Sequence, residues 1–254
     1  MTADEYLQNL IARNRVATEE GSAASNAGNA VYQVVRRWAG QQLRSGSYSG
    51  SYAKETAIRG RTDVDIFISL KSDTTDTLKE IFDGLHGWIA KNGYPNARKQ
   101  NVSVHVVHNS VEVDLVPAVH LGGNTGDHWL YVNKANRERT KTNVDTHINY
   151  VRSSGRINEI ILTKIWRKNH NLDLPSFYLE LAVIEALKYK RSGLADNFLA
   201  VLDDLSTSFV SARCFDPANT NNIISDDLTD AEKKVIASQA GQSRRQQSWS
   251  NVVW

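Results

Sequence analysis

The sequence contains one cysteine, Cys214, so it can form neither an internal disulfide nor a cysteine-based zinc cluster. Proline is scarce, and three of the four prolines fall at junctions between predicted elements. No apolar run approaches the roughly 18 residues of a membrane span. The first five residues carry two acids and no apolar stretch, which excludes a signal peptide. We therefore expect a cytoplasmic protein without a membrane partner.

The sequence also has little net charge, because its 30 basic residues nearly balance its 28 acidic ones and the formal net charge is +2. Nucleic-acid binding therefore has to be argued from a site and not from overall charge. The chain has 254 residues, of which 41% are hydrophobic and 23% are charged, and this composition excludes a disordered or fibrous protein. A chain of this size can bury a substantial core.

Hydrophobic periodicity predicts an α+β fold. Two helices are expected within residues 3–44, separated by a stretch rich in glycine and serine at residues 20–28. From about Thr142 the pattern is helical to the end. The further predicted elements are strands over 64–70, 102–108 and 111–116, a hairpin link at 108–110, a glycine-rich loop over 121–127, and helices over 74–92, 144–153, 155–170, 176–191, 195–210 and 229–246.

These elements predict two domains. A first domain over residues 1–141 would hold a mixed sheet and a long N-terminal spine helix, and a second domain over residues 142–254 would be helical. We expect a bilobal molecule with a central cleft.

Acidic residues lie at the beginning of two of the predicted strands. Asp63 and Asp65 share one face of the first strand, and Glu112 and Asp114 share one face of the second, because side chains alternate along a strand. If the strands are neighbours, three carboxylates converge, and unit charges about 4 Å apart repel by about 4 kcal/mol at an effective dielectric near 20. Such a cluster takes up protons or binds a hard cation.

The chemistry of these ligands favours Mg²⁺ or Mn²⁺ over zinc, since all the donors are oxygens. Two such ions would lower the pKa of an attacking hydroxyl and neutralise a leaving pyrophosphate. Eleven residues separate Asp63 from an earlier Gly50-Ser51 turn, whose backbone N–H groups suit terminal phosphates and whose glycine permits close approach. An acid–apolar–acid strand alone is common, so the prediction depends on the combination of turn, paired acids and later acid.

This combination resembles the polymerase-β-like nucleotidyltransferase superfamily. Within it the chain is most similar to the branch that holds 2′-5′-oligoadenylate synthetases, archaeal CCA-adding enzymes and bacterial CD-NTases, the oligonucleotide cyclases of CBASS anti-phage systems. Three further segments carry the resemblance. They are a lysine-bearing helix at 162–166 followed by S-x-x-L-E-L at 176–181, a "DP…NN" segment at 215–223 and a closing aromatic segment at 249–254.

The resemblance implies a role for single residues. Asp114 is preferred over Glu112 as the third acid, because the family's third acid precedes an apolar–apolar–proline step. The lysine and the serine of the helical half would reach the triphosphate. The implied catalytic residues and metal ligands are Asp63, Asp65 and Asp114, and the implied nucleotide-binding residues are Gly50, Ser51, Lys164 and Ser176.

The activity that the resemblance implies is metal-dependent synthesis of a cyclic oligonucleotide second messenger from nucleoside triphosphates, ATP among them, with release of pyrophosphate. A downstream effector would bind the product, and a nucleic-acid or protein activator is a candidate partner. Nucleotide addition to an RNA or tRNA 3′ end and linear 2′-5′ oligoadenylate synthesis are the alternatives. A catalytically silent nucleotide-binding module is disfavoured because the three acids, Ser51 and Lys164 are all present.

Other chemistry-bearing residues are interpreted as structural. The seven histidines lack metal-ligand spacing, and His105 and His108 are expected on opposite faces of a strand. Arg59 and Arg61 are the best candidates for nucleic-acid contact. The residues expected to pack against a core or loop are Cys214, Trp129 and Tyr131.

Overall fold

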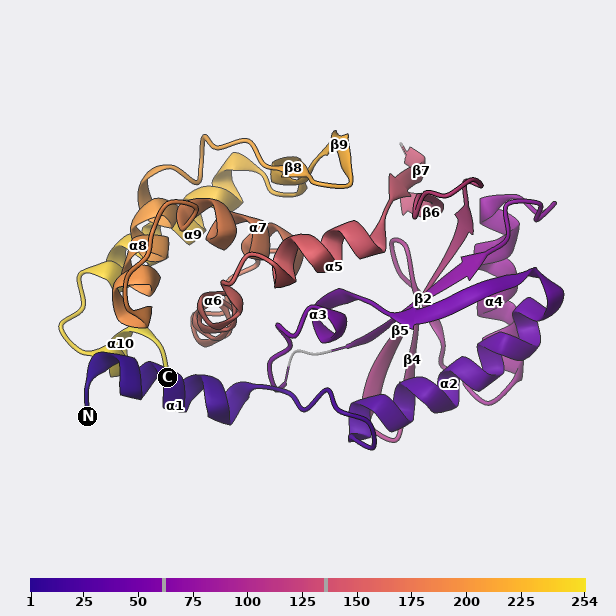
Figure 1. Ribbon diagram of the computed structural model, residues 1–254, viewed down its shortest axis with the longest axis horizontal. Coiled ribbons are helices and arrows are strands. Elements are labelled where there is room, and N and C mark those ends of the chain that lie inside the picture. Colours follow the sequence, from indigo (N-terminus) through magenta and orange to yellow (C-terminus); the bar gives the residue numbers. More distant parts are fainter. Residues whose placement is uncertain (61–62, 135–136) are drawn as a thin grey trace. The chain divides into compact units, whose positions relative to one another are not determined.

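The computed structural model describes residues 1–60, 63–134 and 137–254 and shows an α+β protein that divides into two compact units (Figure 1). The helical unit comprises Met1–Val16, Thr56–Arg61 and Asn149–Trp254, and the sheet unit comprises Ala17–Glu55 and Thr62–Ile148. The sequence assigned the N-terminal helix and residues 56–61 to the first domain, whereas here both segments pack with the helical unit. Arg61, one of the candidate arginines, lies outside the described residues.

The sheet unit is a mixed sheet whose strands follow the order β1-β2-β5-β4-β3, with β6 beside β5 and β7 beside β6. β2 and β5 run parallel, and the other neighbouring pairs are antiparallel. The strands are β1 (Leu43–Tyr48), β2 (Val64–Leu70), β3 (Arg98–Lys99), β4 (Val104–His108), β5 (Val111–His120), β6 (His128–Lys134) and β7 (Arg137–Thr142).

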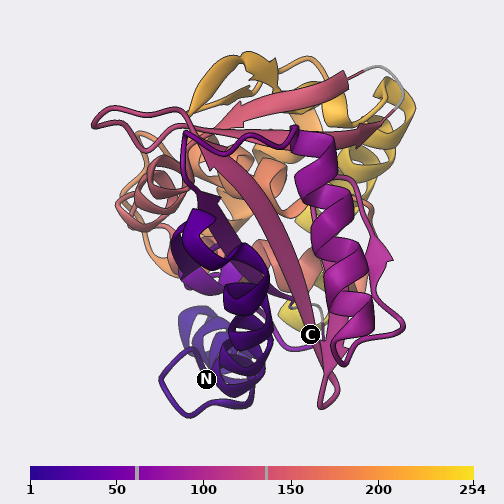
Figure 2. The ribbon, with the colours of Figure 1, turned by 90° about the vertical axis from the view of Figure 1, so that its right-hand side faces the viewer.

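One face of this sheet is covered by two helices, α2 (Ala23–Ala39) and α4 (Leu78–Lys91) (Figure 2). The Ser22 side chain caps α2, and a Thr77–Glu80 capping box begins α4. The alternate residues Val64, Ile66, Ile68 and Leu70 of β2 all enter the core beneath the helices. The intervening side chains of β2, Asp65 among them, therefore face the other side of the sheet.

The sequence prediction missed three of the longer strands in the described part of the sheet. Leu43, counted there as helical, begins β1 after the short 3-10 helix η1 (Gly40–Gln42), and β1 is rich in serine and glycine. Strands β6 and β7 occupy residues 128–134 and 137–142, and the polar β7 shows no apolar alternation. The predicted strand over 64–70 is confirmed, and the predicted helix over 74–92 begins at Leu78.

A two-residue turn fixes how β4 pairs with β5. Asn109 and Ser110 have φ angles of 48° and 64°, the positive values that a type I′ hairpin turn needs at both positions. His108 consequently pairs with Val111, and the antiparallel register continues to His105 opposite Asp114. The predicted hairpin is confirmed.

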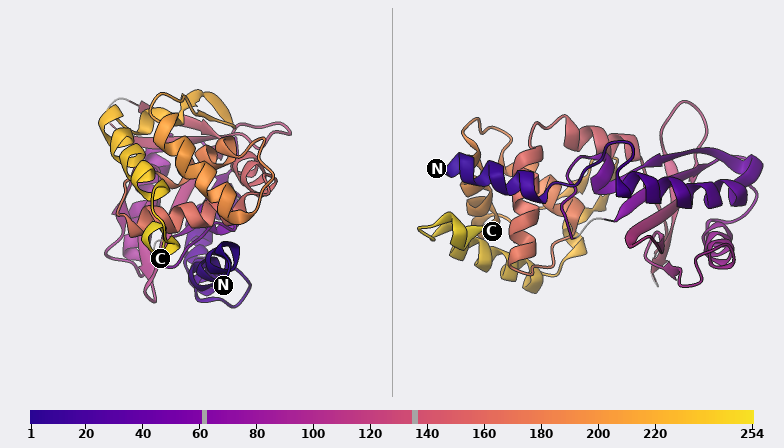
Figure 3. Two further views of the ribbon diagram at one scale, coloured as in Figure 1. Left: turned by 90° about the vertical axis from the view of Figure 1, so that its left-hand side faces the viewer. Right: turned by 90° about the horizontal axis from the view of Figure 1, so that it is seen from below.

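The helical unit is assembled around α6 (Ile157–Asn169), which is buried along most of its length. Helices α8 (Leu194–Thr207) and α9 (Asp230–Arg244) lie side by side, and α1 (Ala3–Asn14) packs near the C-terminal residues, where the Tyr6 hydroxyl donates to the Val253 carbonyl (Figure 3). The other elements are α5 (Val144–Arg152), α7 (Ser176–Ala186), α10 (Trp249–Val252), the hairpin of β8 (Phe215–Asp216) and β9 (Asn219–Ile223), and the 3-10 helix η2 (Ile224–Asp227). None of the described helices has the length and apolarity to cross a lipid bilayer.

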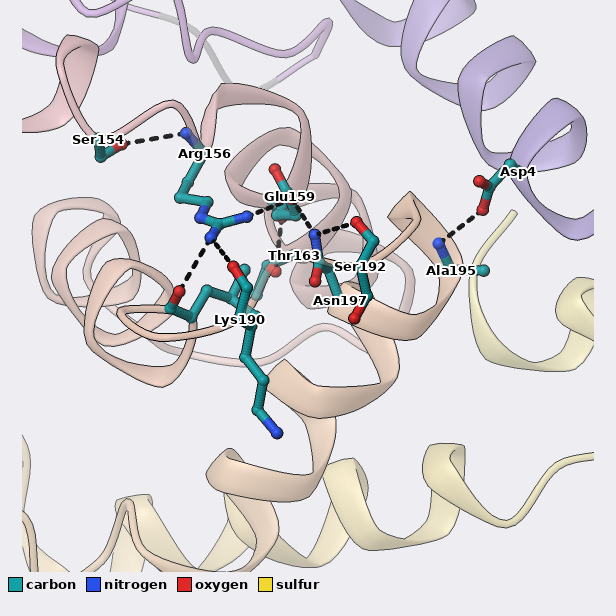
Figure 4. A network of polar contacts seen from close by, with 10 residues as sticks. Asp4, Ser154, Arg156, Glu159, Thr163, Lys190, Ser192, Ala195 and Asn197 are labelled. Atoms are coloured by element: carbon teal, nitrogen blue, oxygen red, sulfur yellow. Dashed lines mark hydrogen bonds and ion pairs between the residues drawn. The ribbon is translucent and has the colours of Figure 1, made fainter.

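A buried polar network ties α6 to α8 (Figure 4). The Glu159 carboxylate accepts from Asn197 Nδ2 at 2.8 Å and pairs with Arg156 Nη1 at 3.4 Å. Arg156 also donates to the backbone carbonyls of Leu187 and Lys190. A buried carboxylate is tolerated here because a cation and an amide satisfy it.

We expect Ser110→Gly to stabilise the hairpin, because glycine adopts a positive φ without the penalty of about 1 kcal/mol that an L side chain meets there. The free energy of unfolding, measured in urea, should rise by up to about 1 kcal/mol. Ser208→Gly is the matched control, since Ser208 ends α8 with a φ of −98° and should gain nothing. A destabilised Ser110→Gly variant would contradict the turn assignment.

Candidate functional site

Three acidic side chains lie together on the face of the sheet opposite α2 and α4. Asp65 of β2 pairs directly with Asp114 of β5 in the parallel register. Asp63 lies two residues before Asp65, close enough to both Asp65 and Asp114 for their charges to affect its pKa. The predicted convergence of three carboxylates is therefore found in the sheet unit.

A fourth carboxylate joins this cluster. The Asp63 and Glu112 side chains lie within hydrogen-bonding reach of each other, and two carboxyl groups can form such a bond only when one of them is protonated. Burial, this hydrogen bond and the charges of Asp114, Glu112 and Asp65 raise the pKa of Asp63 to about 7. We name Asp63, Asp65, Glu112 and Asp114 the acid cluster.

Asp114 is the most buried member of the acid cluster, with 8% of its surface exposed. Its Oδ1 lies 2.9 Å from Nδ1 of His105. Burial raises the pKa of Asp114, and the hydrogen bond and positive charge of His105 oppose that rise. His105 itself is 3% exposed, and its Nε2 has no hydrogen-bond partner among the described residues.

The predicted phosphate turn lies against the same cluster. Gly50 begins the short helix α3 (Gly50–Ala53) with a φ of 57°, and a Cβ added there would lie 1.7 Å from Oδ2 of Asp65. The Ser49 backbone N–H donates to the Asp65 carbonyl at 2.8 Å. Only glycine therefore fits at position 50, and Ser51 follows beside the acids.

The donor set of the acid cluster fits a hard divalent cation, because it consists of carboxylate oxygens that repel one another. Uptake of a proton by Asp63, whose pKa is raised, relieves this repulsion. As they stand, no three His, Cys, Asp or Glu side chains in the described ranges are arranged so that they could hold a metal ion. Asp63 would have to lose such a proton and turn to become a ligand.

Lys164 and Ser176 belong to the helical unit. Lys164 is 2% exposed, and its Nζ donates to Glu180 Oε1 at 2.6 Å and to Thr56 Oγ1 at 2.8 Å. Ser176 is exposed at the first turn of α7 and accepts a hydrogen bond from Arg167. The predicted contacts of Lys164 and Ser176 with a triphosphate stay predictions, and for Lys164 such a contact requires its amino group to leave Glu180.

The segment between Ser51 and Asp63 is anchored where Lys164 lies. Thr56 donates to Glu180 Oε1 at 2.6 Å, and Ile58 is buried in the core of the helical unit. The Arg59 backbone N–H donates to Asn14, and the Arg59 carbonyl accepts from Lys168. The described part of this segment from Thr56 to Arg59 is therefore held by side chains and backbone of the helical unit.

Sequence reasoning missed two members of this site. It set Glu112 aside in favour of Asp114, although Glu112 contacts Asp63. It considered His105 only through its spacing from His108, whereas the turn at residues 109–110 determines that His105 faces Asp114. The residues expected to pack do so: Cys214 lies against the helical core, Trp129 lies beneath the Arg139 guanidinium and Tyr131 contacts Phe82.

Comparisons with known proteins bear on the family and the fold of the chain. A family model described as the Second Messenger Oligonucleotide or Dinucleotide Synthetase domain matches residues 1–154. One similar solved structure is Escherichia coli MS115-1 CdnC with ATP, with a TM-score of 0.74 and 19% identity over 95% of this chain and 90% of that chain. A second is Elizabethkingia meningoseptica CdnE cyclic dinucleotide synthase with GTP and Apcpp, with a TM-score of 0.70 and 14% identity over 94% of this chain and 97% of that chain. A third is the Vibrio cholerae DncV cyclic AMP-GMP synthase, with a TM-score of 0.61 and 10% identity over 97% of this chain and 77% of that chain.

These structural matches show a shared fold, and the expected polymerase-β-like α+β fold is confirmed. CdnC of Escherichia coli MS115-1 is also known in a complex with HORMA-deltaN. No curated protein matches the sequence.

Gly50→Ala should displace the Asp65 carboxylate, because the new methyl group would overlap Oδ2. The positive φ adds strain, so we expect a loss of at least about 1–2 kcal/mol in the free energy of unfolding. Gly87→Ala is the control, since nothing lies within 4 Å of its added Cβ in the middle of α4 and alanine should stabilise that helix by about 1 kcal/mol. Equal stability of Gly50→Ala and the wild type would contradict the close approach.

Lys164→Met should destabilise the helical unit by about 3–5 kcal/mol, because Glu180 would stay buried without its cation. Adding Glu180→Leu should restore most of that loss. Lys188→Met, which removes the partner of the exposed Glu185, should change the free energy of unfolding by less than about 1 kcal/mol. Urea unfolding of the wild type and these three variants tests this prediction, and a small effect of Lys164→Met would contradict the buried pair.

Proposed function

Because the chain belongs to the family of Second Messenger Oligonucleotide or Dinucleotide Synthetase domains, whose model matches residues 1–154, we propose that it makes a cyclic oligonucleotide from nucleoside triphosphates with release of pyrophosphate. The observation that carries this proposal is the pairing of Asp65 with Asp114 beside Asp63, with Gly50 packed against them. ATP is proposed as one substrate, since the similar CdnC was solved with ATP.

In the proposed reaction, a 2′- or 3′-hydroxyl oxygen of one nucleotide attacks the α-phosphorus of another. The bond from that phosphorus to the oxygen bridging the β-phosphate breaks, and pyrophosphate leaves. The hydroxyl proton passes to a base, for which Asp114 is the candidate. A further attack of the same kind closes the ring.

Positioning and charge neutralisation would supply most of the rate enhancement, as in other phosphoryl transfers. Asp63, Asp65 and Asp114 would hold two Mg²⁺ or Mn²⁺ ions, which supply Lewis acidity to the hydroxyl and to the leaving group. Backbone N–H groups at Gly50 and Ser51 would bind the terminal phosphates. Ser176, exposed at the first turn of the eleven-residue helix α7, is a proposed second phosphate contact, and Lys164 is proposed as a third.

We place the product in bacterial anti-phage signalling of the CBASS type, with an effector that binds it. A protein activator is a candidate partner, because the similar CdnC forms a complex with HORMA-deltaN. Both statements come from the family and not from contacts in this chain.

The double variant Asp63→Ala/Asp65→Ala should lose product formation by about 10³-fold or more, because it removes two of the three carboxylates that neutralise and orient the reacting groups. Labelled nucleoside triphosphates with Mg²⁺ or Mn²⁺ report both pyrophosphate and phosphatase-resistant product. Asp73→Ala/Asp76→Ala is the matched control, since both acids are exposed in the loop after β2 and should leave the rate unchanged.

Different outcomes separate the alternatives. Label that enters added tRNA would favour nucleotide addition to an RNA 3′ end, and a phosphatase-sensitive linear product would favour 2′-5′ oligomer synthesis. Nucleotide binding without turnover would favour a silent module. No pyrophosphate with any base mixture, with or without candidate activators, would contradict the proposal.

A further inference from the structure

His105 lies in one row with two of the proposed catalytic acids. Across the neighbouring strands β4, β5 and β2, the register pairs His105 with Asp114 and Asp114 with Asp65. Side chains of directly paired residues point to the same face of a sheet. We propose that His105 is a positioning residue that holds the Asp114 carboxylate in the orientation in which it binds a divalent cation, an inference that rests on the proposed function.

The contact is short and enclosed. His105 Nδ1 lies 2.9 Å from Asp114 Oδ1, and both residues are more than nine-tenths buried. Water therefore competes little for this hydrogen bond, and a bond to an ionised carboxylate is stronger than one between neutral groups.

The other ring nitrogen identifies which atom carries the hydrogen. Nε2 of His105 is buried without a partner among the described residues. A hydrogen on Nε2 would be a buried unsatisfied donor, which costs more than an unused lone pair. The arrangement therefore has Nδ1–H as the donor and Asp114 as the acceptor.

Asp114 needs such a donor because its neighbours repel it. Asp65 lies opposite, and Asp63 and Glu112 lie next to this pair. A carboxylate among like charges lowers its energy by rotating away or by taking up a proton. The donor from His105 fixes Oδ1 against β4, so the plane of the carboxylate is set and Oδ2 is left for a ligand.

A pair of amide variants tests the position of the donor. In His105→Asn the side-chain N–H₂ takes the place of Nδ1 and can still donate to Asp114, whereas in His105→Gln it reaches toward Nε2, where the described residues supply no acceptor. Loss of a partner that orients a metal ligand typically costs 10–100-fold in metal affinity or activity. We expect His105→Gln to lose about that much and His105→Asn to stay within a few-fold of the wild type.

Two measurements are made on the full chain. Mn²⁺ affinity is measured by titration calorimetry without nucleotide, and kcat and KM are measured with nucleoside triphosphates. His105→Gln should weaken Mn²⁺ binding and lower kcat with little change in the nucleotide KM. The control His108→Gln, on the same strand but hydrogen-bonded to Tyr94, should leave Mn²⁺ affinity and kcat unchanged.

Each result has one meaning. Wild-type Mn²⁺ affinity in a folded His105→Gln variant overturns the proposal, and so does equal weakening in His105→Asn and His105→Gln, which would show that only the ring's packing matters. If His105→Gln does not fold, His105→Leu replaces it as the variant without a donor. If the wild type forms no product but the Mn²⁺ affinities of the wild type, His105→Asn and His105→Gln fall in the expected order, the proposed function fails and the role of His105 stands.

Discussion

The parallel pairing of β2 with β5 is the constraint on which the candidate site depends. It places Asp65 opposite Asp114, with Asp63 and Glu112 close by, so four carboxylates share one patch of the sheet. Unit charges about 4 Å apart cost about 4 kcal/mol at an effective dielectric near 20, so these acids favour separation of the strands. The opposite face resists that separation, because the paired residues Val64 and Val113 are fully buried beneath α2 and α4. The same register thus gains stability from one face and concentrates negative charge on the other.

A second constraint acts on the chain between the phosphate turn and the first acid. Ser51 and Asp63 belong to the sheet unit, but Thr56 between them is held by Glu180 and Lys164 inside the helical unit. The Thr56 hydroxyl donates to the carboxylate and accepts from the ammonium group, which completes the hydrogen bonding of a pair that is costly to bury. The resemblance implies that Lys164 contacts a substrate phosphate, which stays a prediction, and the described contacts tie its amino group to Glu180 and Thr56.

Elements with a buried face were predictable from the sequence, and elements held by backbone pairing were not. The strand over 64–70 alternates because one face enters the core, and the helix α4 carries an apolar stripe and a capping box. Strand β1 lacks such a signal since its sequence is LRSGSY, and β7 lacks it since its sequence is RERTKT. Both of these strands pair with a neighbour that supplies the apolar residues, so the information about their conformation lies in another part of the chain.

The sequence predicts which side of the sheet carries the acids, but it does not predict that Asp65 lies directly beside Asp114. Alternation assigns Asp63, Asp65, Glu112 and Asp114 to the side away from the core, and a one-residue slip of either strand would bury them. A two-residue slip keeps every acid on that side yet separates Asp65 from Asp114, and the long crossover between β2 and β5 sets no register by itself. The hairpin is different, because a two-residue turn at 109–110 pairs 108 with 111 and hence 105 with 114. The position of His105 beside Asp114 was therefore contained in the sequence, whereas the position of Asp65 beside Asp114 depends on packing between strands that no turn connects.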